Sequence, residues 1–370
     1  MIYFDHNAST PLDERVLDAM LPFFTTFYGN PSSLYRHGRA VRSAIDTARE
    51  QVAALVNAAP AEVIFTSGGT EANNLSLNTL PAKGRLAISS TEHPSVTDFA
   101  AHLTTKGATL HHIEVDSLGV IPASSIDYVL NLQPDLVSIM LANNETGVIQ
   151  DVRLITDAIK AKNKSILVHT DAVQAVGKIP VSFKELGLDL LTLSSHKIYG
   201  PKGCGAVVYN NEHPLKPLMF GGNQEKDFRP GTENVAAIVG FGKAAELAAI
   251  ELNHRHAHLA QLKQKFEAAL TQIPNLCIFS QTTERLPNTI QFGIDGVDGE
   301  MLLMNLDRGG IAVSSGSACK SGSNEISPVL KAMKIAPNLA KSAIRVSLGM
   351  SNTEDQITQF INQLKKHVNH

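Results

Sequence analysis

Lys197 is the residue whose surroundings point most directly to chemistry. It follows an apolar run of buried-strand length at residues 188–193 and precedes a Gly-Pro-Lys-Gly turn at residues 200–203. In α/β folds, such strand ends carry the reactive groups. A half-buried lysine amine has a lowered pKa, so it can form a Schiff base with an aldehyde cofactor near neutral pH. Because most lysines beside glycine-rich turns are solvated surface charges, this hypothesis requires partners for Lys197.

Two candidate partners follow other predicted strands. Asp171 comes after the apolar run 166–168, and its carboxylate could keep a pyridine nitrogen protonated, although an aspartate there is more often a helix N-cap. His93 precedes a proline at a predicted helix start. It could stack on an aromatic cofactor and move protons, or it could have only a capping or packing role.

Two further strand ends carry small polar residues. The run Thr66-Ser-Gly-Gly-Thr-Glu71 ends a predicted strand and opens a helix, which is how backbone N–H groups and Thr70 can be aimed at a phosphate. Asn144 follows the predicted strand 136–142 and is either a turn residue or a donor to a substrate carboxylate. For any one of these residues alone, a turn, capping, packing or surface role is commoner than a functional one. The five strand ends together nevertheless favour one shared site.

Four collinear motifs also match a known family. They are Thr66-Ser-Gly-Gly-Thr-Glu71, Thr91-Glu-His93, Asp171-Ala-Val-Gln174 and Ser194-Ser-His-Lys-Ile-Tyr-Gly-Pro-Lys-Gly203. With them the chain resembles the cysteine desulfurases, which are pyridoxal-phosphate enzymes related to the class V aminotransferases. The resemblance extends from Tyr3 to Gly349. It implies fold type I of these enzymes, an α/β fold with a mainly parallel central sheet in a large domain and a smaller α+β domain.

The resemblance also implies how pyridoxal 5'-phosphate is bound. Lys197 would carry it as a Schiff base, Asp171 would pair with the pyridinium nitrogen and Gln174 would bond to the phenolic oxygen. His93 would stack on the ring and assist proton transfer. The phosphate-binding residues would be Gly69, Thr70, Ser194, His196 and, from the neighbouring subunit, Thr232. A phosphate site shared in this way implies a homodimer.

The substrate implied by the resemblance is L-cysteine. Its carboxylate would be held by Asn144 and by Arg345, whose guanidinium can form a bidentate pair, and Asn30 would line the entrance. Cys319 lies among small residues beside Lys320, which favours its thiolate. The resemblance implies that Cys319 attacks the substrate sulfur, holds it as a persulfide and leaves alanine.

The sulfur would then pass to an acceptor protein, either an iron–sulfur scaffold or a modification enzyme. Family members that bind a scaffold often have a longer C-terminal extension than this sequence shows, which leaves the scaffold open. The other cysteines, Cys204 and Cys277, lie in strand-like runs, so we expect both to be buried apolar residues. The cysteine spacing predicts no metal site.

Two alternatives stay open. Another enzyme of the same fold, an aminotransferase or a lyase acting on selenocysteine or cystine, would leave Cys319 incidental. Alternatively, the chain could be an inactive sulfur-carrier or interaction subunit. Intact Lys197, Asp171 and His93 argue against the second alternative.

Composition sets the broad class. The chain has 370 residues, of which 43% are hydrophobic and 18% charged, and a formal net charge of -3. This balance gives no reason to expect direct binding of nucleic acid. We find neither a membrane-spanning apolar run nor a signal peptide, so the expected location is cytoplasmic, without a membrane partner.

Alternating strand and helix patterns position the candidate residues. Predicted strands cover residues 62–66, 86–90, 109–115, 136–142, 165–169, 188–193, 205–209, 289–292 and 344–348. Predicted helices cover residues 36–57, 151–162, 299–306 and 353–368, and one long helix or two cover residues 234–269. We expect a large domain at residues 12–250. Residues 1–11 and 251–370 would form the small domain, which carries the Cys319 loop.

Overall fold

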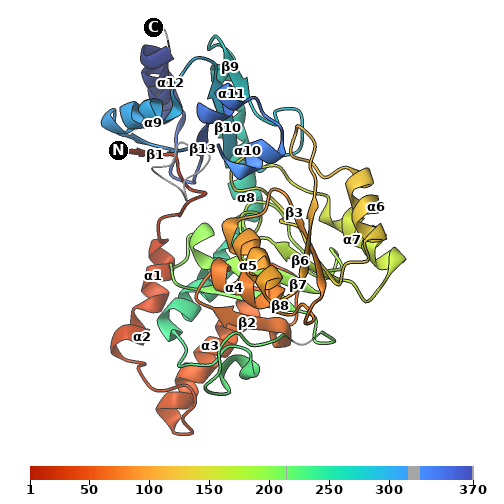
Figure 1. Ribbon diagram of the computed structural model, residues 1–370. Coiled ribbons are helices and arrows are strands. Elements are labelled where there is room, and N and C mark those ends of the chain that lie inside the picture. The colour runs from red at the N-terminus through yellow and green to blue at the C-terminus, as the bar shows by residue number, and fades with distance from the viewer. Residues whose placement is uncertain (214, 316–325, 369–370) are drawn as a thin grey trace.

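The computed structural model describes residues 1–213, 215–315 and 326–368. Within these residues, a seven-stranded sheet forms the centre of the larger part of the molecule, in the order β2-β8-β7-β6-β5-β3-β4 (Figure 1). The run from β7 to β4 is parallel, and β8 is antiparallel to both of its neighbours. The strands are β1 (Ile2–Tyr3), β2 (Val63–Thr66), β3 (Arg85–Ser89), β4 (Thr109–Ile113), β5 (Leu136–Ser138), β6 (Leu167–Asp171), β7 (Leu190–Ser194), β8 (Gly205–Tyr209), β9 (Leu276–Ile278), β10 (Thr289–Ile294), β11 (Ile311–Ala312), β12 (Ser314–Ser315) and β13 (Ile344–Ser347).

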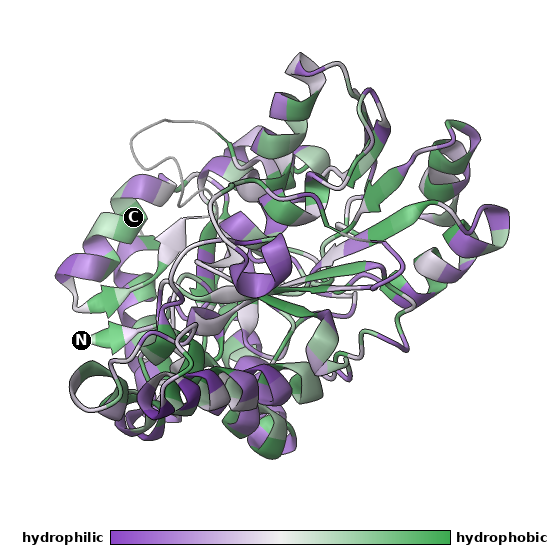
Figure 2. Cartoon of the chain, turned by 90° about the horizontal axis from the view of Figure 1, so that it is seen from below, coloured by the Kyte–Doolittle hydropathy of each residue, from purple (hydrophilic) through white to green (hydrophobic). Residues whose placement is uncertain are grey.

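Helices cover both faces of this sheet. The residues of β6, β7 and β8 are buried, and neighbours such as Leu190 and Leu191 belong to different hydrophobic clusters, one on each face. A parallel sheet requires such cover on both sides, and Figure 2 shows hydrophobic residues concentrated in the strands. The helices are α1 (Glu14–Met20), α2 (Pro22–Thr25), α3 (Arg36–Leu55), α4 (Gly69–Leu77), α5 (Pro94–Thr105), α6 (Ala123–Asn131), α7 (Val152–Lys162), α8 (Val235–Leu270), α9 (Gly299–Arg308), α10 (Pro328–Ala332), α11 (Pro337–Lys341) and α12 (Glu354–Val368).

A second, smaller core lies around the antiparallel sheet β12-β13-β10-β9. Phe4, Phe266, Phe292 and Phe360 pack together in it, with ring centroids of Phe266 and Phe360 4.9 Å apart. The N-terminal strand β1 pairs in parallel with β11, so the first residues of the chain lie beside its C-terminal third. The structure therefore has a second sheet and core where the sequence predicted a smaller α+β unit.

Helix α8 connects the two cores as one helix of 36 residues. Its residues up to Ala248 pack under the central sheet, whereas Leu259 and the apolar residues after it join the smaller core. The domain boundary expected at residue 250 lies inside this helix, and the division into two domains stays a prediction.

Most strand ends differ from the predicted ranges by one or two residues, and two of the differences bear on the site. Strand β5 ends at Ser138, four residues earlier than predicted, although the backbone N–H groups of Ile139 and Leu141 still donate to the carbonyls of His169 and Asp171 at 3.0 and 2.9 Å. Strand β6 runs two residues further than predicted, to Asp171. This extension places the Asp171 carboxylate at the carboxyl end of the sheet.

None of the described helices is long and apolar enough to cross a membrane.

Candidate active site

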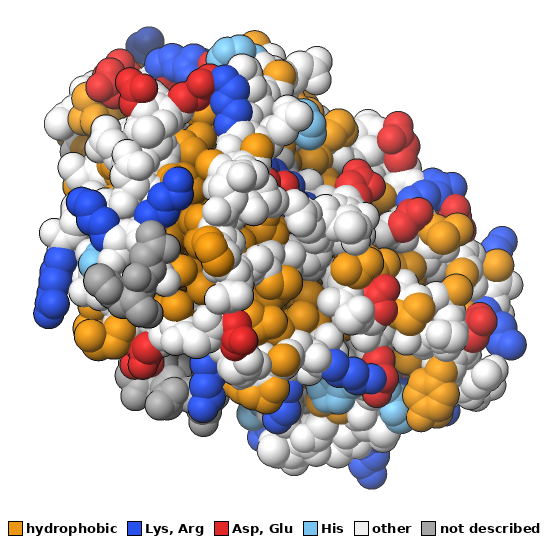
Figure 3. Space-filling model, turned by 90° about the horizontal axis from the view of Figure 1, so that it is seen from above, with side chains coloured by type: hydrophobic (Ala, Val, Ile, Leu, Met, Phe, Trp, Pro, Cys, Tyr) orange, Lys and Arg blue, Asp and Glu red, His pale blue; other side chains and the backbone are white. Residues whose placement is uncertain are grey.

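A cavity of about 420 Å³ lies at the carboxyl ends of the central strands. In the space-filling view, hydrophobic side chains gather across the middle of the upper face and charged ones lie mainly toward its rim (Figure 3). The cavity lining includes most of the residues predicted from the sequence: Gly69, Thr70, His93, Asn144, Asp171, Gln174, Ser194, His196, Lys197 and Arg345. The fold thus brings all five strand ends to one site.

Lys197 is the last residue of a 3-10 turn that directly follows strand β7. Its Nζ donates to the backbone carbonyls of Asn7 at 2.6 Å and Ala8 at 2.7 Å. The N-terminal segment therefore helps to hold the candidate nucleophile. Sequence reasoning missed Asn7 and Ala8, for which the only signal was their place inside the N-terminal part of the family resemblance.

A chain of hydrogen bonds joins Asp171 to His93. Asn73 Nδ2 donates to Asp171 Oδ2 at 2.7 Å and to Ser95 Oγ at 2.8 Å. The Ser95 hydroxyl lies 2.8 Å from His93 Nδ1, and the Ser95 backbone N–H donates to the same nitrogen at 3.1 Å. Because Nδ1 accepts hydrogen bonds, the neutral ring carries its proton on Nε2.

Burial lowers the pKa of His93, while the Asp171 carboxylate acts in the opposite direction and Lys197 adds to the lowering. His93 is the N-cap of α5, and Pro94 fills the first helical position, as the sequence predicted. His93 is thus placed as a neutral imidazole that lines the cavity.

The start of helix α4 offers donors for an anion. Its first backbone N–H groups have no partner within the helix, and Thr70 stands in the first turn. A Cβ at Gly69 would lie 3.2 Å from Val173 Cγ2, so glycine allows α4 to begin close to the segment after β6. Ser194 Oγ is buried without a hydrogen-bond partner among the described residues and lines the same cavity.

His196 also lines the cavity. Its Nδ1 lies 3.2 Å from Ser9 Oγ. Burial lowers the pKa of His196 to about 4, with contributions from Lys197 and Lys202, so the ring is a neutral hydrogen-bonding group at neutral pH.

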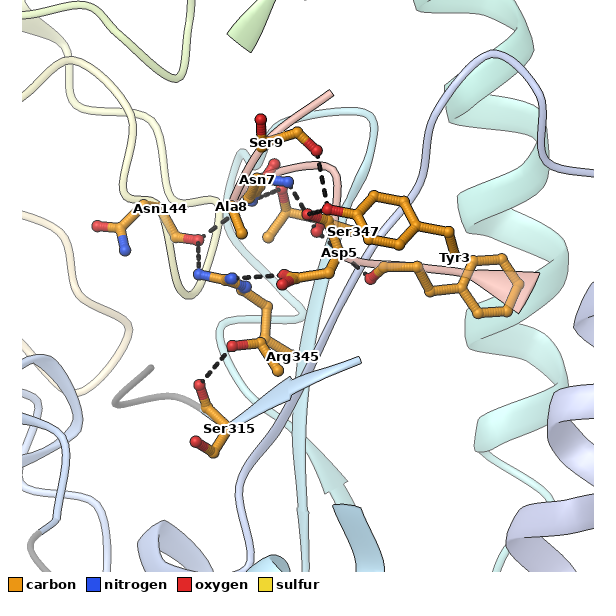
Figure 4. Close-up of polar contacts among 12 residues, drawn as sticks. Tyr3, Asp5, Asn7, Ala8, Ser9, Asn144, Ser315, Arg345 and Ser347 are labelled. Carbon is orange, nitrogen blue, oxygen red and sulfur yellow. Dashed lines mark hydrogen bonds and ion pairs between the residues drawn. The ribbon is translucent and has the colours of Figure 1, made fainter. Parts of the chain in front are cut away.

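Arg345 on strand β13 is held on two sides (Figure 4). Nη2 pairs with Asp5 Oδ1 at 2.7 Å, and Nη1 donates to the Asn144 backbone carbonyl at 3.1 Å. Its Nε is buried without a partner among the described residues. A carboxylate entering the cavity could accept from this guanidinium.

Two acidic residues of the cavity were not predicted. Glu92 is buried, accepts from the Met140 backbone N–H at 2.6 Å, and has a pKa well above the usual range because of burial and the nearby Asp171. Burial raises the pKa of Glu145 to about 7, although hydrogen bonds from Ser327 and Gln291 and the charge of Arg345 oppose this. Both glutamates directly adjoin predicted residues, which was the available signal.

Three predicted site residues are not among the residues that line this cavity. Asn30 and Thr232 are exposed on the surface and are absent from the lining. Cys319 lies outside the described residues. Their roles therefore stay predictions.

Of the two remaining cysteines, Cys204 is buried as expected, and burial raises the pKa of its thiol. The expectation that Cys277 is buried was wrong, because its side chain is exposed on β9. Its neighbours Leu276 and Ile278 pack against the smaller core, and because successive side chains of a strand point to opposite faces, Cys277 lies on the other, uncovered face. No cluster of three or more potential metal ligands occurs in the described part of the chain, so this part gives no support for a metal site.

A strand-end lysine, a buried aspartate and an open helix start line one cavity, an arrangement in which an amine nucleophile could act beside a bound anion. The family described as Aminotransferase class-V matches residues 2–360, so the chain belongs to the class V aminotransferase family.

Relatives within this family carry more specific names. A protein of Nostoc sp. (strain PCC 7120) named cysteine desulfurase is 41% identical over 366 residues, which cover 98% of this chain and 91% of the relative. A solved structure called NifS-like protein is 36% identical, with a TM-score of 0.93, and the match covers 99% of this chain and 98% of the other. The structure titled SspA in complex with cysteine is 31% identical, with a TM-score of 0.82, and the match covers 94% and 99% of the two chains.

Proposed function

We propose that this protein is a pyridoxal-phosphate-dependent cysteine desulfurase, which converts L-cysteine to L-alanine and transfers the sulfur to Cys319. The observation that carries the proposal is the single cavity that joins Lys197, Asp171, His93 and Arg345. The cysteine desulfurase that is 41% identical, and the cysteine complex of the SspA neighbour, support this substrate.

The residues of the cavity fit the cofactor. The unpartnered Ser194 Oγ and the start of α4 are suited to its phosphate, the Asp171 carboxylate to its pyridinium nitrogen and Lys197 to its aldehyde. When bound, pyridoxal phosphate withdraws electrons from the substrate α-carbon and makes its proton acidic. The proposal assigns all other steps to side chains of this chain.

Arg345 would bind the substrate carboxylate, since its guanidinium is already fixed by Asp5 and Asn144. The Nε2 side of His93 would receive and return protons. In the overall reaction, the substrate Cβ–S bond breaks, an S–S bond forms with the thiolate of Cys319, and Cβ gains a proton. The products are alanine and a persulfide, and no external oxidant is needed.

The proposal includes a homodimer. Thr232 is exposed, as a residue that serves a neighbouring subunit would be in a single chain. Several large apolar side chains in α2 and in the segment from α2 to α3 are exposed as well: Phe24, Phe27, Tyr28, Leu34 and Tyr35. An exposed apolar group of this size is typical of a protein interface. The sulfur acceptor and the cytoplasmic location remain predictions without further support.

A single-turnover assay tests the function. The purified protein with pyridoxal phosphate is mixed with L-cysteine, and alanine and the mass of the Cys319 peptide are followed. We expect alanine and the gain of one sulfur atom on Cys319, and both should be lost in Cys319→Ala. The matched control is Cys277→Ala, which removes an exposed thiol elsewhere and should leave both products unchanged. Alanine formation that survives Cys319→Ala would contradict the proposal and favour a lyase that cleaves the Cβ–S bond without this thiol, whereas the absence of alanine and persulfide from the wild type would favour an aminotransferase.

A further inference from the structure

Lys178 is a buried lysine beside the active site that the proposed reaction does not use. Its exposed fraction is 6%, and no carboxylate forms an ion pair with it among the residues described. Burial lowers its pKa well below the ordinary value, and the nearby charges of Lys197 and Arg345 add to this effect. A buried amine without a counter-charge is costly to keep, so its retention calls for a specific role.

The partners of Lys178 are amide oxygens at the cavity wall. Its Nζ donates to Gln174 Oε1 at 2.8 Å and to Asn7 Oδ1 at 3.1 Å. Asn288 Nδ2 donates to the same Asn7 oxygen at 3.0 Å. Lys178 therefore connects the segment after β6 to the N-terminal segment that holds Lys197.

The orientation of the Gln174 amide follows from these contacts. The backbone carbonyl of Asn7 can only accept, and Gln174 Nε2 donates to it at 3.0 Å. The oxygen of the amide must then face Lys178, which supplies a donor. An amide nitrogen has two hydrogens, and Asn7 takes one of them, which leaves the second for a ligand of the cavity that Gln174 lines.

We propose that Lys178 is a positioning residue for the cofactor. It holds the Gln174 amide oxygen so that the N–H edge of this amide can donate to an anionic ring oxygen of a ligand bound at Lys197. This inference rests on the proposed function, because that ring oxygen belongs to pyridoxal phosphate. Lys178 acts through Gln174 and is not assigned a contact with the substrate.

A double-mutant cycle tests the inference. Lys178→Met, Gln174→Ala and the double variant are prepared without cofactor, and pyridoxal phosphate is titrated in while the visible absorption band is followed. Loss of the oriented hydrogen bond from Gln174 to an anionic ligand oxygen predicts that Lys178→Met raises the dissociation constant about ten- to a hundredfold. The double variant should bind no more weakly than Gln174→Ala alone, because Lys178 works through that amide.

Two further variants serve as a control and as a replacement if Lys178→Met does not fold. Lys263→Met removes a half-buried lysine away from the cavity, whose Nζ donates to the Leu286 carbonyl at 2.9 Å, and should leave cofactor affinity unchanged. If Lys178→Met does not fold, Lys178→Gln, which retains a donor without the charge, should show a smaller change in the same direction.

The outcomes separate this inference from the function on which it rests. If Lys178→Met and Gln174→Ala weaken binding additively, or if Lys178→Met only lowers the unfolding temperature, Lys178 has a general structural role and the inference is wrong. If the wild-type protein gives no visible band with pyridoxal phosphate, the proposed function itself fails.

Discussion

Arg345 and Asp5 lie 340 positions apart in the chain and form an ion pair of 2.7 Å. An isolated bridge between Asp5 and Ser347 places the N-terminal segment beside strand β13 and brings the aspartate to the guanidinium. Both side chains are largely shielded from water. Asp5 therefore fixes one edge of the arginine, and the unpartnered Nε remains for a ligand.

Weakening this pair should weaken substrate binding. In Asp5→Asn the charge that orients Arg345 is lost, so we expect a several-fold higher KM for cysteine with a smaller change in kcat. Arg345→Lys keeps the charge without the planar fork and should lower kcat/KM about ten- to a hundredfold. As a control, Arg153→Lys alters an exposed ion pair with Asp157 and should have no effect. An unchanged KM in Asp5→Asn together with full activity of Arg345→Lys would contradict this role.

The hydrogen-bond chain from Asp171 to His93 predicts a single imidazole tautomer. Nitrogen-15 NMR of histidine-labelled protein should show His93 protonated on Nε2 and not on Nδ1 at neutral pH, with the signal assigned by its loss in His93→Gln. Ser95→Ala removes the hydroxyl contact but keeps the backbone N–H donor, so the tautomer should persist. Loss of one such hydrogen bond should lower kcat about fivefold. A proton found on Nδ1 would contradict the acceptor role of this nitrogen.

The sequence identified the strand-end residues because each one follows an apolar run. Lys197 after β7, Asp171 at the end of β6 and His93 before α5 all lie where a local pattern changes from buried to polar. Parallel strands then bring their carboxyl ends together, so the local pattern was enough to predict the shared site.

Long-range partners left no such pattern. Asn7 meets Lys197 across 190 positions, and Asp5 meets Arg345 across an even longer separation. Both contacts involve the N-terminal segment, which the pairing of β1 with β11 holds beside the C-terminal third of the chain. Because β1 has only two residues, its sequence shows no alternating pattern that predicts this pairing. The exposure of Cys277 likewise depends on which face of β9 is covered by the smaller core, which is a property of the assembled structure.

A buried ion pair stabilises strand β2, which lies at the edge of the central sheet. Arg49 donates to both carboxylate oxygens of Glu225, at 2.7 and 2.6 Å, and Glu225 also accepts from the Phe65 backbone N–H at 2.9 Å. Removing one partner leaves an uncompensated buried charge, so Arg49→Met should reduce the free energy of unfolding by about 3–5 kcal/mol. Replacing the exposed Arg153 by Met should change it by less than about 1 kcal/mol. Chemical denaturation measures both values, and equal losses would contradict the special role of the buried pair.

Glu145 predicts a pH dependence of stability. Burial raises its pKa in the fold to about 7 from the ordinary value of 4.5, so between these pH values the folded chain binds a proton that the unfolded chain releases. The contribution of Glu145 to the free energy of unfolding is therefore fully present below about pH 4.5. It is lost as the pH rises to about 7, by about 3 kcal/mol in total. Glu145→Gln cannot titrate, so the difference between the unfolding free energies of wild type and variant should change by this amount across the window. The exposed Glu300→Gln should show no such change, and a constant difference for Glu145→Gln would mean that Glu145 is already ionised in the fold at acidic pH.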